Sequence, residues 1–200
     1  MRTPLSSSVA LFAAAMATGA IAQNPGQAAP AFSVTDVAGK PVALADYKGK
    51  YVVLEWTNPE CPFVRAQYKA EAMQAVQKEA GAKDVVWLTI NSTNQSHYEY
   101  KTGPQMASWM TEQGAAPKAI LIDPTSAAAR AYAAKTTPHM FVIDPAGKVI
   151  YNGAIDDKRS ASVSDRKTAN NYVRAALNDV TAGRPVVVAS TQPYGCSLKY

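Results

Sequence analysis

Apolar and polar residues alternate near the start of the chain and then give way to a solid apolar run. The alternation surrounds the turn residues 38–40, which predicts a β-hairpin. Residues 51–56, with the sequence YVVLEW, are apolar at nearly every position, a pattern typical of a buried central strand.

The period changes after Pro62. Apolar residues now recur every four positions until Gly81, which predicts one amphipathic helix ended by a glycine; these residues are Val64, Tyr68, Ala72 and Val76. The order is therefore strand, short loop, helix, with Cys61 at the join.

Strands and helices continue to alternate through the rest of the chain. The pattern predicts strands at 84–91, 118–123, 139–144 and 148–155, and helices at 103–114, 125–134 and 169–180. Alternation of this kind predicts an α/β sheet covered by helices on both faces, with the last two strands forming an antiparallel hairpin.

The first 22 residues have the pattern of a secretory signal peptide. A basic start at Arg2 precedes an apolar run and the small residues Ala20 and Ala22, so we expect cleavage after Ala22. The apolar stretch is short for a membrane span, and we expect no stable membrane insertion. The predicted organisation is a signal peptide at 1–22, one domain at 23–183 and a tail at 184–200, in a periplasmic or secreted protein.

Size and charge narrow the class of protein. With 200 residues, 48% hydrophobic and 18% charged, the chain can build one full core. Without Arg2 it carries 19 basic and 15 acidic side chains, a formal charge of +4. The charges form no basic block, which argues against nucleic acid as a partner. Export permits disulfides, so the two cysteines have to be considered as a pair.

Cys61 lies where a helix begins. Pro62 suits the first helical position, which makes Cys61 the expected N-cap, and the free amides there favour a thiolate, the reactive form of cysteine. Glu60 would oppose the anion and Arg65 would support it, depending on where each side chain points. For either residue alone, a solvated side chain at the helix rim is the favoured interpretation.

A Thr-Pro pair precedes the strand predicted at 139–144. Proline cannot donate to a ladder, so Pro138 marks a turn, for which local sequence alone favours an ordinary trans bond. A cis bond would instead offer the backbone of Thr137 for pairing with an extended ligand.

Four segments carry a family resemblance: NPECPFV at 58–64, TTPHMFVID at 136–144, GAIDDKR at 153–159 and PYGCSLKY at 193–200. Together with the rest of the mature chain from about residue 25, they resemble the peroxiredoxin-like group of the AhpC/TSA (redoxin) family. The resemblance implies a thioredoxin-like fold, with a central mixed β-sheet flanked by helices on both faces and an N-terminal β-hairpin extension.

The resemblance also implies roles for particular residues. Cys61 matches the reactive cysteine and Pro138 the cis-proline that faces it. Val64 occupies the place of the second cysteine of a thioredoxin Cys-x-x-Cys. A peroxiredoxin has Thr or Ser three residues before its cysteine, whereas this chain has Asn58 there and Thr57 one residue earlier. This departure argues against efficient peroxidase chemistry.

Cys196 is the other cysteine, in a tail made extended and bendable by Gly and Pro residues. It could serve as a resolving thiol that forms a redox-active bond with Cys61, as half of a permanent crosslink, or as a link between chains. Our hypothesis is that Cys61 is the nucleophile and Cys196 the resolving thiol.

Other candidates have plainer explanations. His139 could share a proton with the thiol, or bind Cu(I) with Cys61 and Met140, but a satisfied loop histidine explains it as well. Arg130 and Arg159 are both candidates for the arginine that a peroxiredoxin places beside its cysteine; solvated or ion-paired side chains are the alternative.

Trp56 ends the strand that leads to Cys61 and is expected in the pocket wall. Together these features predict an exported thiol-disulfide oxidoreductase or thiol peroxidase without a cofactor or metal. Its expected partners are a peroxide or protein disulfide and an external thiol reductant such as a thioredoxin-like protein. The alternative is a non-catalytic binding module, for copper or peptides, with a structural Cys61–Cys196 disulfide.

Overall fold

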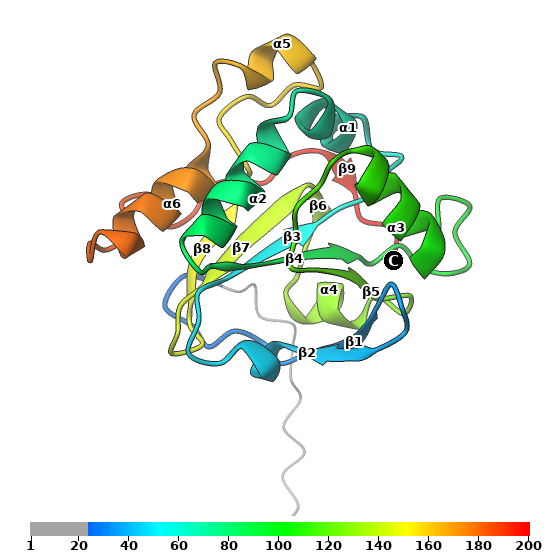
Figure 1. Cartoon of the computed structure of the whole chain (residues 1–200), viewed down its shortest axis with the longest axis horizontal. Coiled ribbons are helices and arrows are strands. Elements are labelled where there is room, and N and C mark those ends of the chain that lie inside the picture. Colours follow the sequence, from blue (N-terminus) through cyan, green and yellow to red (C-terminus); the bar gives the residue numbers. More distant parts are fainter. Residues whose placement is uncertain (1–23) are drawn as a thin grey trace, which may run out of the picture.

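A seven-stranded mixed sheet forms the centre of the computed structural model, which describes residues 24–200; the signal peptide predicted at 1–22 lies outside them. The strand order is β2-β1-β5-β4-β3-β7-β8, and a second sheet pairs β6 with β9 (Figure 1). The strands are β1 (Ser33–Asp36), β2 (Pro41–Ala43), β3 (Val52–Trp56), β4 (Val86–Asn91), β5 (Ala119–Ile122), β6 (Thr136–Thr137), β7 (His139–Ile143), β8 (Val149–Gly153) and β9 (Cys196–Ser197).

Helices cover both faces of the large sheet (Figure 1). α1, α2, α3 and α6 supply one core cluster and α4 supplies the other. The helices are η1 (Leu44–Tyr47, a 3-10 helix), α1 (Pro62–Lys69), α2 (Ala72–Ala82), α3 (Gly103–Glu112), α4 (Ala127–Ala131), α5 (Val163–Arg166) and α6 (Tyr172–Thr181). The predicted α/β architecture with helices on both faces is confirmed, and β1 and β2 form the predicted hairpin at one edge.

The position of β3 places Cys61. β3 runs parallel to β4 and antiparallel to β7, with Trp56 opposite His139. The loop after β3 therefore lies at the same sheet edge as the segment that enters β7. This register brings Cys61 to the Thr137-Pro138 peptide.

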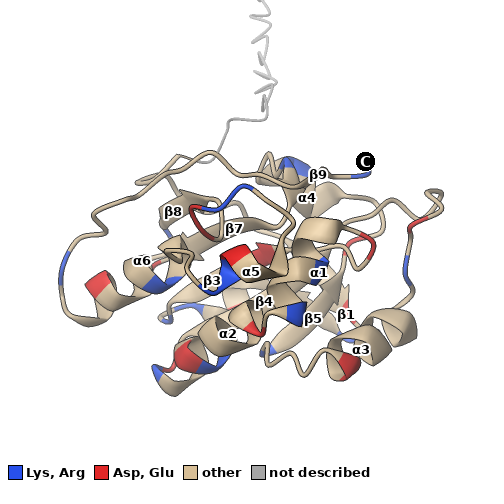
Figure 2. Ribbon diagram, turned by 90° about the horizontal axis from the view of Figure 1, so that it is seen from above, with Lys and Arg blue, Asp and Glu red and all other residues tan. Residues whose placement is uncertain are grey.

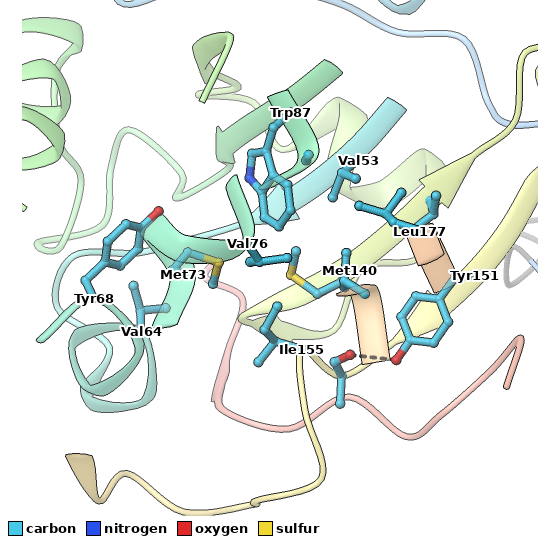
Figure 3. Packing of buried hydrophobic residues seen from close by; sticks show 14 of the residues in the cluster. Val53, Val64, Tyr68, Met73, Val76, Trp87, Met140, Tyr151, Ile155 and Leu177 are labelled. Atoms are coloured by element: carbon cyan, nitrogen blue, oxygen red, sulfur yellow. Dashed lines mark hydrogen bonds between the residues drawn. The ribbon is translucent and has the colours of Figure 1, made fainter. Parts of the chain in front are cut away.

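Side chains alternate between two cores along β3. Val53 lies in the cluster under α1 and α2, whereas Leu54 and Trp56 lie in the cluster under α4, as a period of two requires. Figure 3 shows the first cluster, in which Met73 and Val76 pack with side chains from the sheet and from α6. Burial of each apolar side chain of this cluster stabilises the fold by about 1.5–3 kcal/mol. Side chains of α1 and α2 both belong to the cluster, so this burial holds the helix after Cys61 against the sheet.

One acidic side chain lies inside the first core. The fully buried Glu55 carboxylate accepts hydrogen bonds from Tyr68 Oη (2.9 Å), Gln77 Nε2 (3.1 Å), Trp87 Nε1 (2.8 Å) and Thr89 Oγ1 (2.9 Å). Burial raises the pKa of Glu55, and these hydrogen bonds oppose the increase. Four neutral donors thus satisfy the acid and tie α1 and α2 to the sheet.

The single helix predicted from Pro62 to Gly81 is wrong. The chain forms α1 and α2 instead, separated at Glu71, which has a left-handed φ of 57°. The side chain of Gln74 donates to the Tyr68 carbonyl at 2.8 Å and so satisfies a backbone group at the end of α1. A four-residue apolar spacing continues across the break, which hides it from the sequence.

Charged residues of both signs are interspersed over the helices and loops (Figure 2), in agreement with their scatter along the sequence. Within residues 24–200, no helix combines the length and the apolar character needed to cross a bilayer.

Candidate functional site

Cys61 forms the N-cap of α1, with Pro62 in the first helical turn, as predicted. A tight loop leads to it from β3: the Asn58 side chain accepts from the Glu60 amide at 2.8 Å, and the Asn58 carbonyl accepts from the Cys61 amide at 3.0 Å. Only 2% of Cys61 is exposed. The Cys61 side chain accepts no capping hydrogen bond from the helix.

The sulfur contacts the opposite loop instead. Cys61 Sγ lies 3.0 Å from the Thr137 carbonyl oxygen, to which the thiol donates. The Thr137-Pro138 peptide is cis, as the resemblance implied. Two buried hydroxyls, those of Thr57 and Thr137, have no hydrogen-bond partner within residues 24–200. Polar groups of this kind are uncommon in a core and are available to a bound molecule.

Cys196 reaches the same place from the other end of the chain. β9 pairs antiparallel with β6, with Cys196 opposite Thr137 and Ser197 opposite Thr136 (Figure 1). Both cysteines are free thiols. Burial, a hydrogen bond to Cys61 and a charge on Cys61 together raise the pKa of the Cys196 thiol to about 12. The backbone of Thr137, which we expected a cis bond to open to an extended ligand, is thus paired with the chain's own tail.

The last part of the tail, residues 189–200, lies closely against the strands. Gly195 has a φ of +130°, and a Cβ there would lie 2.0 Å from the Thr137 carbonyl oxygen, so only glycine fits. Farther along, the Asn94 amide donates to the Lys199 carbonyl at 2.8 Å, and the Leu198 amide donates to the Lys135 carbonyl at 3.1 Å. The tail is held on both sides of Cys196.

Glu60 and Arg65 neutralise each other at the rim of the site. Arg65 Nη2 lies 2.6 Å from Glu60 Oε2, and Lys101 Nζ lies 2.8 Å from Glu60 Oε1. A hydrogen bond from Lys101 and the charges of Lys101 and Arg65 lower the pKa of Glu60, and burial opposes this decrease. The carboxylate is therefore directed at two cations, which answers the question that the sequence left open.

A buried arginine lies beside the tail. Arg166 Nη1 lies 2.8 Å from Asp156 Oδ2, and Tyr194 Oη donates to Asp156 Oδ1 at 2.5 Å. Burial raises the pKa of Tyr194 and the hydrogen bond to Asp156 raises it further, so the phenol stays protonated and donates. The sequence did not single out this cluster, although Tyr194 stands two residues before Cys196 in the motif PYGC.

Arg130 and Arg159, the two candidates for a peroxiredoxin-type arginine, have partners away from the sulfur. Arg130 stacks on the Tyr200 ring, with Cζ 4.5 Å from the centroid, and Arg159 Nη1 lies 3.4 Å from Gln192 Oε1. Asp156, which is close to Arg159 in the sequence, pairs with Arg166.

Trp56 belongs to the second core rather than to a pocket wall. It is fully buried, packs on the rings of Tyr132 and Phe141 at 5.2 and 5.3 Å between centroids, and donates to Ser92 Oγ at 3.0 Å. The expectation that it lines the site is therefore corrected: its position on β3 directs it to the face opposite Val53.

His139 is likewise engaged on that second face. Its Nδ1 accepts from the Lys135 amide at 3.1 Å, which leaves Nε2 to donate to Asn152 Oδ1 at 2.8 Å. With both ring nitrogens occupied, the proposed proton sharing with Cys61 has no free nitrogen. Met140 follows His139 on β7 and lies in the other core, so these two residues do not converge with Cys61 on a copper ion. Residues 24–200 contain no cluster of three or more His, Cys, Asp or Glu side chains able to hold a metal.

His139 makes folding sensitive to acid. Burial lowers the pKa of His139 to about 4 from its usual 6.5, so between these values the unfolded chain binds a proton that the folded protein does not. As pH falls from 6.5 to about 4, we expect the wild type to lose about 1.4 kcal/mol per pH unit relative to His139→Gln. Urea unfolding of both proteins across this range measures the difference; parallel pH profiles would contradict the prediction.

Comparison with known proteins identifies a family to which this chain is similar. A model described as the AhpC/TSA family matches residues 25–152. No curated protein matches. Among solved structures, an uncharacterized conserved protein from Geobacillus kaustophilus is 30% identical, with a TM-score of 0.76 over 88% of this chain and 92% of that one.

Two further structures carry descriptions of redox proteins. A pneumococcal exposed lipoprotein thioredoxin from Streptococcus pneumoniae is 26% identical, with a TM-score of 0.50 over 70% of this chain and 99% of that one. The thioredoxin domain of a thiol-disulfide oxidoreductase from Bacteroides vulgatus is 20% identical, with a TM-score of 0.52 over 73% of this chain and 98% of that one, and shows the fold alone.

Proposed function

Because this chain belongs to the AhpC/TSA family and has the thioredoxin fold, we propose that it is a thiol-disulfide oxidoreductase or thiol-dependent peroxidase with Cys61 as nucleophile and Cys196 as resolving thiol. The observation that carries the proposal is the pairing of Cys196 with Thr137, whose carbonyl accepts the hydrogen bond from Cys61. Two free thiols that lie together in one chain favour an intramolecular redox pair over a link between chains.

The proposed reaction begins at Cys61. Its thiolate attacks one oxygen of a peroxide, the O–O bond breaks, and the other oxygen leaves as hydroxide or alkoxide, which takes a proton from water; Cys61 is left as a sulfenic acid. With a disulfide substrate, the same thiolate displaces one sulfur and forms a mixed disulfide. The unpartnered hydroxyls of Thr57 and Thr137 supply donors for the oxidant at this step.

Cys196 then resolves the intermediate. Its sulfur attacks Cys61, and either water or the substrate thiol leaves, which yields the Cys61–Cys196 disulfide. Before this step, burial and the charge on Cys61 hold the Cys196 thiol protonated. Oxidation of Cys61 removes the part of the increase in the pKa of Cys196 that comes from the Cys61 charge, whereas the burial of Cys196 persists. An external dithiol such as a thioredoxin-like protein returns two electrons and two protons to the pair.

We also propose that the protein is exported. The N-terminal pattern is that of a signal peptide cleaved near Ala22, which leaves a domain at 23–183 and a tail at 184–200. The pneumococcal relative is described as an exposed lipoprotein, which agrees with a redox protein outside the cytoplasm. A periplasmic or secreted location lets a Cys61–Cys196 disulfide persist until a reductant opens it.

Replacing Cys196 by serine tests the second step. We expect Cys196→Ser to accumulate a Cys61 sulfenic acid after peroxide, or a mixed disulfide after a disulfide substrate, because no second thiol removes it. Dimedone labelling and mass spectrometry measure the adduct in the wild type and the variant. Peroxide consumption and protein disulfide reduction assayed side by side then distinguish the two substrates. Absence of any Cys61 adduct in the variant would overturn the assignment of Cys196.

A further inference from the structure

A buried ion pair lies between α5 and the segment after β8. The side chains of Arg166 and Asp156 are 1% and 3% exposed, and Arg166 Nη1 lies 2.9 and 2.8 Å from the two carboxylate oxygens. Such a pair is retained at a large desolvation penalty unless further hydrogen bonds satisfy both ions. The hydrogen-bond partners of the two ions therefore show which segments the ion pair holds together.

The other end of the guanidinium binds backbone groups. Arg166 Nη2 donates to the carbonyls of Lys158 and Ser160 at 2.6 and 2.9 Å, and the Lys158 amide donates to Asp156 Oδ1 at 2.9 Å. The loop between β8 and α5 is thereby wrapped around the ion pair, and Asp156 is held in a fixed orientation. Figure 2 shows α5 beside α1, the helix for which Cys61 is the N-cap.

Asp156 binds both of the segments that carry cysteines. From α1, Gln67 Nε2 donates to Asp156 Oδ2 at 2.6 Å. From the tail, Tyr194 Oη donates to Asp156 Oδ1 at 2.5 Å and accepts from Arg166 Nη1 at 2.7 Å. One carboxylate thus fixes the helix of Cys61 and the strand of Cys196 relative to each other.

The Tyr194 ring adds an apolar contact to the same helix. It packs edge-on against Phe63, two residues after Cys61, with 5.8 Å between centroids and 63° between planes. Only 5% of Tyr194 is exposed. Because Gly195 alone separates Tyr194 from Cys196, anchoring the ring restricts the resolving sulfur to a small volume.

We propose that Tyr194, held by Asp156 and Arg166, is a positioning residue that raises the effective concentration of Cys196 at Cys61. The inference rests on the proposed function, since it concerns the step that forms the Cys61–Cys196 disulfide. In the reduced protein the anchored tail has already lost its conformational freedom, so closing the disulfide loses less entropy. Tyr194 touches no reacting atom; it acts through Cys196.

The redox equilibrium with glutathione tests this role. In that exchange the two thiols give two electrons and two protons to glutathione disulfide, which leaves as two molecules of glutathione. Tyr194→Phe keeps the ring against Phe63 and removes the hydroxyl that binds the ion pair. We expect the equilibrium constant for disulfide formation to fall about tenfold, the usual effect of a hydrogen bond to a charged group, or about 30 mV in reduction potential.

Tyr132→Phe is the matched control. Tyr132 is also buried, and its hydroxyl donates to the Pro30 carbonyl at 2.9 Å in the second core. Its loss is expected to lower stability and leave the glutathione equilibrium within twofold of the wild type. In a Cys196→Ser background, iodoacetamide is expected to alkylate Cys61 at the same rate with Tyr or Phe at position 194, which shows that the effect is on Cys196.

Three results would overturn the inference. These are a Tyr194→Phe equilibrium constant within twofold of the wild type, an equal fall in Tyr132→Phe, or a changed rate of Cys61 alkylation in the Tyr194→Phe background. If the wild type forms no Cys61–Cys196 disulfide at all, the proposed function fails first and the inference with it. Should Tyr194→Phe not fold, Phe63→Leu loosens the same anchor from the α1 side, and a fall of less than threefold would count against the proposal.

Discussion

Replacing Cys61 by serine should abolish the thiol chemistry of this protein, with a fall of at least about three orders of magnitude in peroxide consumption and in disulfide reduction. A serine hydroxyl is not ionised near neutral pH, so the variant lacks the anion that starts either reaction. The substitution is nearly isosteric and retains a group that can donate to the Thr137 carbonyl, so the fold should persist. Steady-state rates with both substrates, measured beside the wild type, provide the test.

The comparison with Cys196→Ser makes this result specific. Both variants replace a cysteine by serine in the same buried site, but only Cys196→Ser keeps the sulfur that attacks the oxidant. A single turnover of oxidant should therefore occur in Cys196→Ser and not in Cys61→Ser. Unchanged rates in Cys61→Ser, for both substrates, would remove the basis for assigning a redox activity to Cys61.

Replacing Gly195 by alanine should expel the tail from its place at Thr137. The new Cβ would lie 2.0 Å from the Thr137 carbonyl oxygen and 2.8 Å from its carbon, and backbone atoms of the sheet edge have little room to move. Because Cys196 is the next residue, we expect formation of the Cys61–Cys196 disulfide after a peroxide pulse to slow by about 100-fold or more, as expected when a reacting group loses its position. Quenched-flow mass spectrometry follows the disulfide directly.

Gly183→Ala is the control for backbone strain. Gly183 also has a positive φ, +72°, and lies just before the tail, but no atom of residues 24–200 lies within 4 Å of the place that a Cβ would occupy there. This variant therefore adds a left-handed alanine without the collision, and disulfide formation should remain within about threefold of the wild type. Similar rates in the two variants would mean that the fit of Gly195 against Thr137 does not hold Cys196 in place.

The sequence predicts the local geometry of Cys61 well because that geometry depends on neighbours in the chain. Pro62 after an apolar strand defines the helix start, and the N-cap position of Cys61 follows. The break at Glu71 escapes prediction because a non-glycine residue adopts a left-handed φ there, against local preference. The four-residue apolar spacing gives no sign of it.

Contacts between distant segments are the part that a single sequence does not reveal. In the sequence, Asp156 and Arg166 are two ordinary charges among several nearby, and only folding brings them together with Tyr194 and Gln67. The errors at Trp56 and His139 have a different origin. Trp56 ends the strand that leads to Cys61 and His139 follows Pro138, which suggested a shared site, but strand alternation directs both side chains to the opposite face of the sheet.

The pairing of β9 with β6 sets up a competition at the sheet edge. An extended polypeptide can pair with the backbone of Thr137 only after β9 has been displaced. Its apparent affinity is therefore its intrinsic affinity multiplied by the fraction of molecules in which β9 is detached from β6. A small oxidant does not require β9 to detach, because it does not pair with the backbone of β6. The protein is therefore expected to react with small molecules directly, and to bind extended protein partners only in proportion to the population in which β9 is detached.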